Sequence, residues 1–293
     1  MKKFLTIMLL SVAMAAGAQT DTLSHSAFTA VYLYECKTVD ADGQPVVDSL
    51  FLAVQAADGI TKCFPYNDYK RQKHERDDII DTYKAAQMHV GTIFMNYPAG
   101  RVTVQEELYP YRYQTDEAWR APEWTLTEGE DSVMGYLCQK ASTTYNGLTW
   151  HACYTEEVAS SIGPWKLGGL PGLITRASDD KGVHTFTLCG LLREEQPVLL
   201  TEYVTWIVPE GPRFVRQRVD FKKKSAADFL AYKKKVLGSS RYLKDPTYYA
   251  PDAMNAFGYV EKHYSGASGS SVNSVAGVVI LNKAHQYQPL EIQ

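Results

Sequence analysis

The chain has 293 residues, of which 45% are hydrophobic, so it can bury a sizeable core as one large domain or two smaller ones. Its formal net charge is −3 at pH 7. Proteins that bind nucleic acid usually carry a basic field, so we expect no nucleic acid partner. The five cysteines show no C-x-x-C spacing. This argues against a thioredoxin-like redox site, and the odd number leaves at least one thiol unpaired within a monomer.

The first 18 residues have the features of a secretory signal peptide. Lys2 and Lys3 form a positive start, residues 4–14 are mostly apolar, and Ala16-Gly17-Ala18 gives an A-x-A cleavage pattern. The apolar run is shorter than the roughly 18 residues of a membrane anchor, and no cysteine follows it to carry a lipid. The sequence therefore predicts an exported protein of the periplasm or beyond, starting at Gln19, with no transmembrane segment after removal of the signal.

Residues 19–293 have the pattern of a single β-rich domain. Strands are predicted where β-branched and aromatic residues gather, at 28–38, 48–55, 59–65, 91–96, 101–108, 124–127, 135–155 (a hairpin), 173–178, 183–188, 202–208, 212–221 and 278–281. Residues 67–88 are helical in character, with Asn67 as a possible cap, and the small polar stretch 265–274 predicts a loop. The fold class predicted is mainly β: a curved antiparallel sheet or partly closed barrel with one or two helices.

A second helix is predicted after Ser225, which suits the N-cap position, and before Gly238. Two lysine clusters, at 222–224 and 233–235, flank its centre and are basic exceptions in an acidic chain. A solvated helix face is the interpretation that these clusters favour. Contact with an anionic lipid or glycan is the alternative.

The clearest hairpin spans residues 135–155 around Asn146-Gly147, a pair that suits a type I′ turn because both residues must adopt positive φ. A two-residue loop places Tyr145 opposite Leu148, which makes Cys138 a diagonal neighbour of Cys153. Diagonal neighbours are somewhat far apart for a relaxed disulfide, but a one-residue bulge would align them. A Cys138–Cys153 disulfide is therefore one hypothesis, and two buried thiols are the other.

The segment 163–174 reads GPWKLGGLPGLI and combines turn-forming residues with large apolar ones. It lacks the Lys-Ser or Lys-Thr of a phosphate loop and leads into a strand rather than a helix. The favoured interpretation is structural: a compact double turn whose apolar side chains are buried. Its members are Gly163, Pro164, Trp165, Gly168, Gly169, Leu170, Pro171, Gly172, Leu173 and Ile174, together with Leu167.

The turn residues predict specific geometry. Pro164 is expected at the second position of a tight turn, and Leu170-Pro171-Gly172-Leu173 matches a type II turn in which Gly172 supplies positive φ. Gly168 and Gly169 are expected to let the backbone pass close to another element.

No catalytic or metal signature stands out. The chain has no G-x-S-x-G elbow. A hydrolase site could combine Ser160 or Ser161 with His151 or His184 only if the fold brought these residues together in space. The run His74 to Asp78 lacks the second histidine of H-E-x-x-H, so a solvated helix face is favoured there. We expect no cofactor and no metal.

Several strings together carry a family resemblance. They are GYLCQKA at 135–141, YNGLTWHACYT at 145–155, GPWK at 163–166, GLPGLI at 169–174 and YQPLEI at 287–292. With them the chain resembles the GLPGLI family of exported proteins of Gram-negative bacteria. The resemblance implies an exported β-rich protein without implying an activity. The Gly-Tyr-x-Cys…Trp rhythm is also similar to that of half-barrel carriers that sort outer-membrane lipoproteins, although folds host many functions.

The chain departs from the family pattern at three places. Leu148 stands where the family tends to have Arg after the turn glycine, which puts an anion-binding role there in doubt. Ala152-Cys153-Tyr154 replaces the usual Ala-Trp-Tyr, and residues 158–161 lack an Ile-Pro.

Three functions follow as hypotheses. The aromatic content of 20 Tyr, 10 Phe and 5 Trp favours a non-enzymatic binding or carrier module for an apolar ligand, such as a lipid, or for an envelope protein. A structural partner of an outer-membrane assembly is the second hypothesis. An unrecognised hydrolase built around His151 or His184 is the third.

Overall fold

The computed structural model describes residues 22–40, 42–73, 85, 88–108, 111–200, 203–207, 214–218, 220–239 and 290. The signal-peptide prediction, the loop 265–274 and the strand 278–281 lie outside these residues. The strands are β1 (Thr22–Ser26), β2 (Thr29–Val39), β3 (Pro45–Ala57), β4 (Ile60–Pro65), β5 (Thr92–Met95), β6 (Arg101–Leu108), β7 (Tyr111–Ala118), β8 (Thr125–Val133), β9 (Tyr136–Tyr145), β10 (Leu148–Thr155), β11 (Leu173–Asp179), β12 (His184–Leu192), β13 (Gln196–Leu199), β14 (Tyr203–Ile207), β15 (Phe214–Arg218) and β16 (Lys222–Lys224). The helices are α1 (Tyr66–Gln72) and α3 (Ala226–Leu237).

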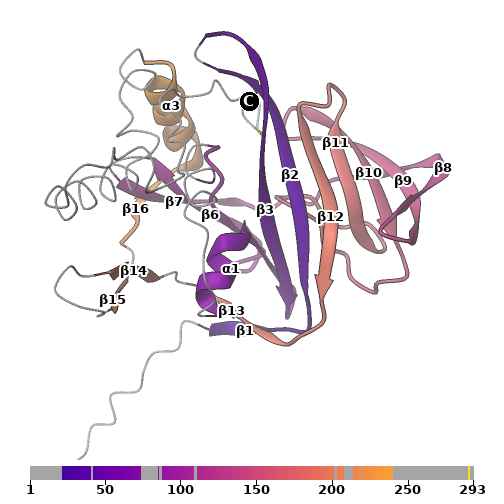
Figure 1. The fold of residues 1–293 in the computed structure, drawn as a ribbon, viewed down its shortest axis with the longest axis horizontal. Coiled ribbons are helices and arrows are strands. Elements are labelled where there is room, and N and C mark those ends of the chain that lie inside the picture. The colour runs from indigo at the N-terminus through magenta and orange to yellow at the C-terminus, as the bar shows by residue number, and fades with distance from the viewer. Residues whose placement is uncertain are drawn as a thin grey trace, which may run out of the picture.

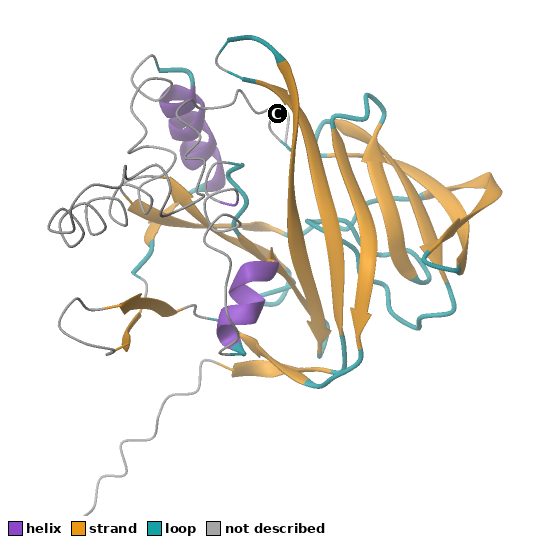
Figure 2. Cartoon of the chain, in the orientation of Figure 1, coloured by secondary structure: helices purple, strands orange, loops and turns teal. Residues whose placement is uncertain are grey.

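Twelve strands form one curved sheet in the order β16-β7-β6-β5-β4-β3-β2-β12-β11-β10-β9-β8 (Figure 1). Neighbouring strands run antiparallel, except that β16 runs parallel to β7. The sheet ends at β16 and β8 and is open. The pairs β1–β13 and β14–β15 form two small further sheets. The predicted fold class, a curved antiparallel sheet with one or two helices, is therefore correct (Figure 2).

Alternation along β2 separates the two faces of the sheet. Ala30, Tyr32, Tyr34 and Cys36 all point into the main core and are at most 3% exposed. We call this the inner face. The opposite, outer face carries a smaller cluster in which Tyr69 of α1 packs on residues of β3 and β4. A strand that is buried on one face in this way has side chains that alternate with a period of two.

The two-residue turns have the predicted geometry. Asn146 and Gly147 have φ of 51° and 78°, and Leu148 pairs with Tyr145 as the type I′ turn requires. Asp58 and Gly59 have φ of 51° and 77° and join β3 to β4 in the same way.

The helix ends show one success and one error. Ser225 caps α3 as predicted, because its hydroxyl accepts a hydrogen bond from the backbone N–H of Asp228 at 3.1 Å. Helix α1 has Pro65 rather than Asn67 at its N-cap, since β4 runs directly into it. The sequence analysis also missed β1, β7, β13 and β16. Within the described parts of the chain, no helix combines the length and hydropathy of a membrane span.

The disulfide hypothesis is not supported by the structure, in which all five cysteines are free. Cys153 pairs with Lys140 across β9–β10 in continuous register, so Cys138 remains a diagonal neighbour. The bulge that would have aligned the two sulfurs lies on the other side of β10, between β10 and β11. The Cys138 Sγ instead lies 3.1 Å from the Thr175 hydroxyl.

We expect five titratable thiols when the protein is denatured without reductant, and one fast-reacting thiol, Cys189, in the native state. Cys189 is exposed, whereas burial raises the pKa of Cys63 to about 12 and of Cys36 to about 11, and only the thiolate reacts. Thiol counting with a chromogenic disulfide reagent measures both numbers. The variant Cys189→Ser serves as the control and should lack the fast phase. Three thiols after denaturation would establish a disulfide and contradict the structure.

Candidate functional site: the loop from Gly163 to Ile174

The segment Gly163–Ile174 leads from the connection after β10 into the first two residues of β11, and it folds back on the chain before it. Ile162 and Gly168 form an isolated antiparallel bridge, and Gly169 donates its backbone N–H to the Ser161 carbonyl at 2.9 Å. Ile174 donates to the Ile162 carbonyl at 3.0 Å. These bonds satisfy the backbone of a segment that is largely buried, which any buried loop needs.

The large apolar side chains of this loop are part of the main core. Five of them are at most 5% exposed: Trp165, Leu167, Leu170, Leu173 and Ile174. The Trp165 ring lies against Trp150 of β10, with ring centroids 5.5 Å apart, and meets Tyr145 edge-on at 6.0 Å. Burial of such side chains is worth about 1.5–3 kcal/mol each before entropy is counted. The loop therefore covers the inner face with the chain's own residues.

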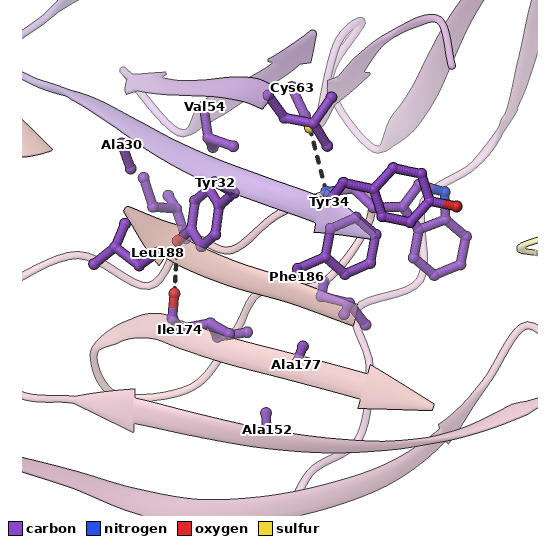
Figure 3. Close-up of a cluster of buried hydrophobic side chains, with 14 of the residues drawn as sticks. Ala30, Tyr32, Tyr34, Val54, Cys63, Ala152, Ile174, Ala177, Phe186 and Leu188 are labelled. Atoms are coloured by element: carbon purple, nitrogen blue, oxygen red, sulfur yellow. Dashed lines mark hydrogen bonds between the residues drawn. The ribbon is translucent and has the colours of Figure 1, made fainter. Parts of the chain in front are cut away.

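Two hydrogen bonds tie the loop to the opposite wall of this core. The Tyr32 hydroxyl of β2 donates to the Ile174 carbonyl at 2.6 Å, and the Trp165 backbone N–H donates to the Cys63 sulfur of β4 at 3.3 Å. Figure 3 shows the first bond between the labelled residues and the second ending on Cys63. Burial raises the pKa of both Tyr32 and Cys63, so these groups stay neutral at ordinary pH.

Two polar contacts hold the rim of the loop. Lys166, 3% exposed, places its ammonium 2.5 Å from the Glu117 carboxylate of β7. The Trp124 indole N–H donates to the Gly168 carbonyl at 2.8 Å. Sequence reasoning identified Lys166 only as part of the GPWK string, and nothing in the sequence indicated its partner 49 residues away.

Gly172 and Pro164 act differently from the sequence prediction, whereas Gly168 makes the predicted close approach, because a Cβ there would lie 3.1 Å from the Ser161 carbonyl oxygen. Gly172 does not have positive φ, so the type II turn is not formed; its N–H bonds back to the Leu170 carbonyl at 2.8 Å. Gly172 is required by space, because a Cβ there would lie 2.1 Å from the Thr155 carbonyl oxygen. Pro164 is the first rather than the second residue of its turn, which closes from the Leu167 N–H to the Pro164 carbonyl at 3.0 Å.

The left-handed backbone positions of the loop are Trp165, with φ of 56°, and Gly169, with φ of 89°. A Cβ at Gly169 would meet nothing within 4 Å, so glycine is needed at this position only because the backbone has positive φ. Trp165 holds a conformation that a bulky residue rarely adopts. Its buried ring and its bond to Cys63 hold it there.

The hydrolase hypothesis combined Ser160 or Ser161 with His151 or His184, and the fold places the two histidines on opposite faces of the sheet. His184 lies on the inner face and is 2% exposed, with its Nδ1 3.0 Å from the Tyr34 hydroxyl and its backbone N–H on Asp179 at 2.6 Å. His151 is exposed, and its register with Ser178 places it on the outer face. The sheet thus stands between the two histidines.

In the described part of the chain, no three His, Cys, Asp or Glu side chains lie close enough together to hold a metal ion. The run His74 to Asp78 lies outside the described residues. A buried polar group is formed by Tyr34, His184 and Asp179, each at most 3% exposed. His184 bonds to both of the others, so the group orders this part of the core.

Comparisons with known proteins identify no relative by sequence: no family model matches the chain, and no curated protein does. Among solved structures, two of PNGF-II, in the P21 and C2 space groups, are similar to it with TM-scores of 0.41 and 0.40 at 15% identity. The similarity covers 71% and 69% of this chain and 32% of the PNGF-II chain in each case, so this chain spans about a third of the length of PNGF-II. With TM-scores below 0.5, the likeness does not establish a common fold.

We expect Gly172→Ala to lower the free energy of unfolding by about 3 kcal/mol, because the added Cβ collides with backbone that cannot yield easily. Gly169→Ala should cost only about 1 kcal/mol, the price of a left-handed angle in open space. Chemical denaturation of both variants measures the difference. The reverse order would show that the backbone angle, rather than the close approach, makes glycine necessary in this loop.

For the ion pair at the rim, we expect Glu117→Gln to cost about 3 kcal/mol, because it removes the carboxylate that faces a buried ammonium. Lys166→Met should cost about 1 kcal/mol or less, since Met keeps the apolar stem and Glu117, 29% exposed, remains hydrated. Glu107→Gln is the matched control: its acid is equally exposed, but its partner Arg112 is 30% exposed, so a loss below about 1 kcal/mol is expected. Equal losses for Glu117→Gln and Glu107→Gln would contradict a structural role for Lys166.

Proposed function

We propose that the chain is an exported, non-enzymatic binding module of the GLPGLI type that engages an envelope protein through its surface. The observation that carries this proposal is the filling of the inner face by the loop Gly163–Ile174. Within the described residues the chain's own side chains cover the inner face, so we place the binding surface on the outside of the sheet.

The filled inner face disfavours the carrier of an apolar ligand. A carrier needs an apolar concavity that its ligand can enter. Here Trp165, Leu167 and Leu170 occupy that space at 5% exposure or less, and backbone bonds to Tyr32 and Cys63 fix the loop at two points. Admitting a lipid would expose these side chains and break both bonds.

A catalytic role is disfavoured by the positions of the reactive side chains. The buried Tyr34–His184–Asp179 group is closed to solvent, and His151 lies across the sheet from it. Catalysis needs acid, base and reacting atom within hydrogen-bond reach of one another.

The ribbon formed by β8 and β9 is the candidate contact surface for the partner. Three large apolar side chains are more than half exposed there: Leu126, Met134 and Leu137. Large exposed apolar side chains on one element are typical of interaction sites. The edge backbone of β8 is a poorer contact, because a bulge between Thr127 and Glu130, with Gly129 at φ of 102°, interrupts its pairing edge.

The test is site-specific photo-crosslinking in intact envelopes, with the reactive side chain at Leu126 or Leu137. We expect one discrete protein adduct from these positions, and none from Val47, which is as exposed as Leu137 at 57% but lies on β3. Absence of an adduct at the ribbon, or the same adduct at Val47, would refute the assignment. Native mass spectrometry of protein purified from membranes distinguishes a surface-binding module from a lipid carrier. We expect the protein without ligand, and a stoichiometric lipid would favour a carrier.

A further inference from the structure

The strand β16 and the helix α3 carry a strongly positive surface on a chain that is acidic as a whole. Residues 220–239 contain six lysines and two aspartates, a net charge of +4, whereas the whole chain has −3. Lys222, Lys223 and Lys224 are exposed on β16, and Lys234 and Lys235 are exposed on α3. Among the six lysines of this segment, Lys233 is the one with a recorded carboxylate partner, Glu106, at 2.5 Å.

The two elements form one surface because α3 packs beside β16 on the end of the sheet. Phe229 of α3 meets Tyr113 of β7 with ring centroids 5.0 Å apart, and β16 pairs with β7 in parallel. Lys224 of β16 places its ammonium 5.5 Å from the centre of the Tyr232 ring. Tyr232 lies one helical turn before Lys235, so the strand and helix lysines are neighbours.

An exposed aromatic side chain completes the surface. Tyr111, 45% exposed, lies under the Lys222 ammonium at the start of β7. Four large side chains of α3 pack on the sheet: Phe229 contacts Leu108 and Tyr113 and is joined by Tyr232, Val236 and Leu237. These side chains are not available for insertion into a bilayer, so we expect attraction at this surface to be electrostatic.

We propose that the lysine surface of β16 and α3 docks the protein on an anionic lipid bilayer. Clusters of four to eight basic residues are attracted to anionic headgroups, with tyrosine suited to the polar interface. Nucleic acid fits less well, because the cations are all lysine rather than the bidentate arginine, and the chain as a whole is acidic. This docking goes beyond the binding of an envelope protein and stands on the charges of this segment alone.

The experiment is co-sedimentation of the purified protein with vesicles of phosphatidylcholine, with and without phosphatidylglycerol. We expect binding only to the anionic vesicles, and a steep loss as salt shortens the Debye length from about 10 Å at 0.1 M toward about 3 Å at 1 M. The variant Lys223→Glu/Lys234→Glu should lower the partition coefficient on the order of a hundredfold, because each reversal replaces an attraction by a repulsion. Both lysine side chains are exposed, so folding is expected to persist, which melting checks.

The matched control is Lys37→Glu/Lys181→Glu, which makes the same change in net charge at exposed lysines beyond this surface. It should change binding far less than the test variant. An equal loss of vesicle binding in the two variants would show that only the net charge of the protein matters, and it would overturn the proposal. So would equal binding to neutral vesicles, or tighter binding to a DNA duplex or to inorganic phosphate than to anionic vesicles.

Discussion

The close passage of Gly172 across the backbone of Thr155 determines how the sheet is covered. The two residues lie where β10 ends and β11 begins, and no side chain fits between them. This contact lets β11 return beside β10 while the intervening loop rises over the inner face. An open sheet must cover its apolar face with something, since exposed apolar area of that size is unfavourable in water. Here the cover is the loop itself.

Covering the sheet in this way gives its two faces different chemistry. The inner face is aromatic and closed, with its hydroxyl, thiol and imidazole groups buried in contact with one another or with the backbone. The groups that can meet other molecules lie at the two ends of the sheet: apolar side chains on β8 and β9, and lysines on β16 and α3. The two surfaces are at opposite edges of one strand order, so they can be occupied together.

The sequence predicted what depends on local chemistry and missed what depends on distant partners. Asn146-Gly147 determined a turn and its register because positive φ is a property of those two residues. The burial of Trp165 and Leu170 followed from apolar residues between turn formers. The pairing of Lys166 with Glu117, and the crowding of Gly172 by Thr155, could not be predicted, since neither partner is marked by any local pattern. The strand β7 was also missed, although Tyr113 and Thr115 are buried on one of its faces, because most of its residues are polar or charged.

The bonds that fix the loop also set an order on folding. Tyr32 and Ile174 are 142 residues apart in the chain, and Cys63 and Trp165 are 102 apart. Contacts of such separation form slowly, because the entropy of closing the long segment is lost before the contact is gained. The N-terminal strands cannot complete their core until residue 174 has joined them. The order in which these contacts form is therefore tied to the position of residue 174 in the chain.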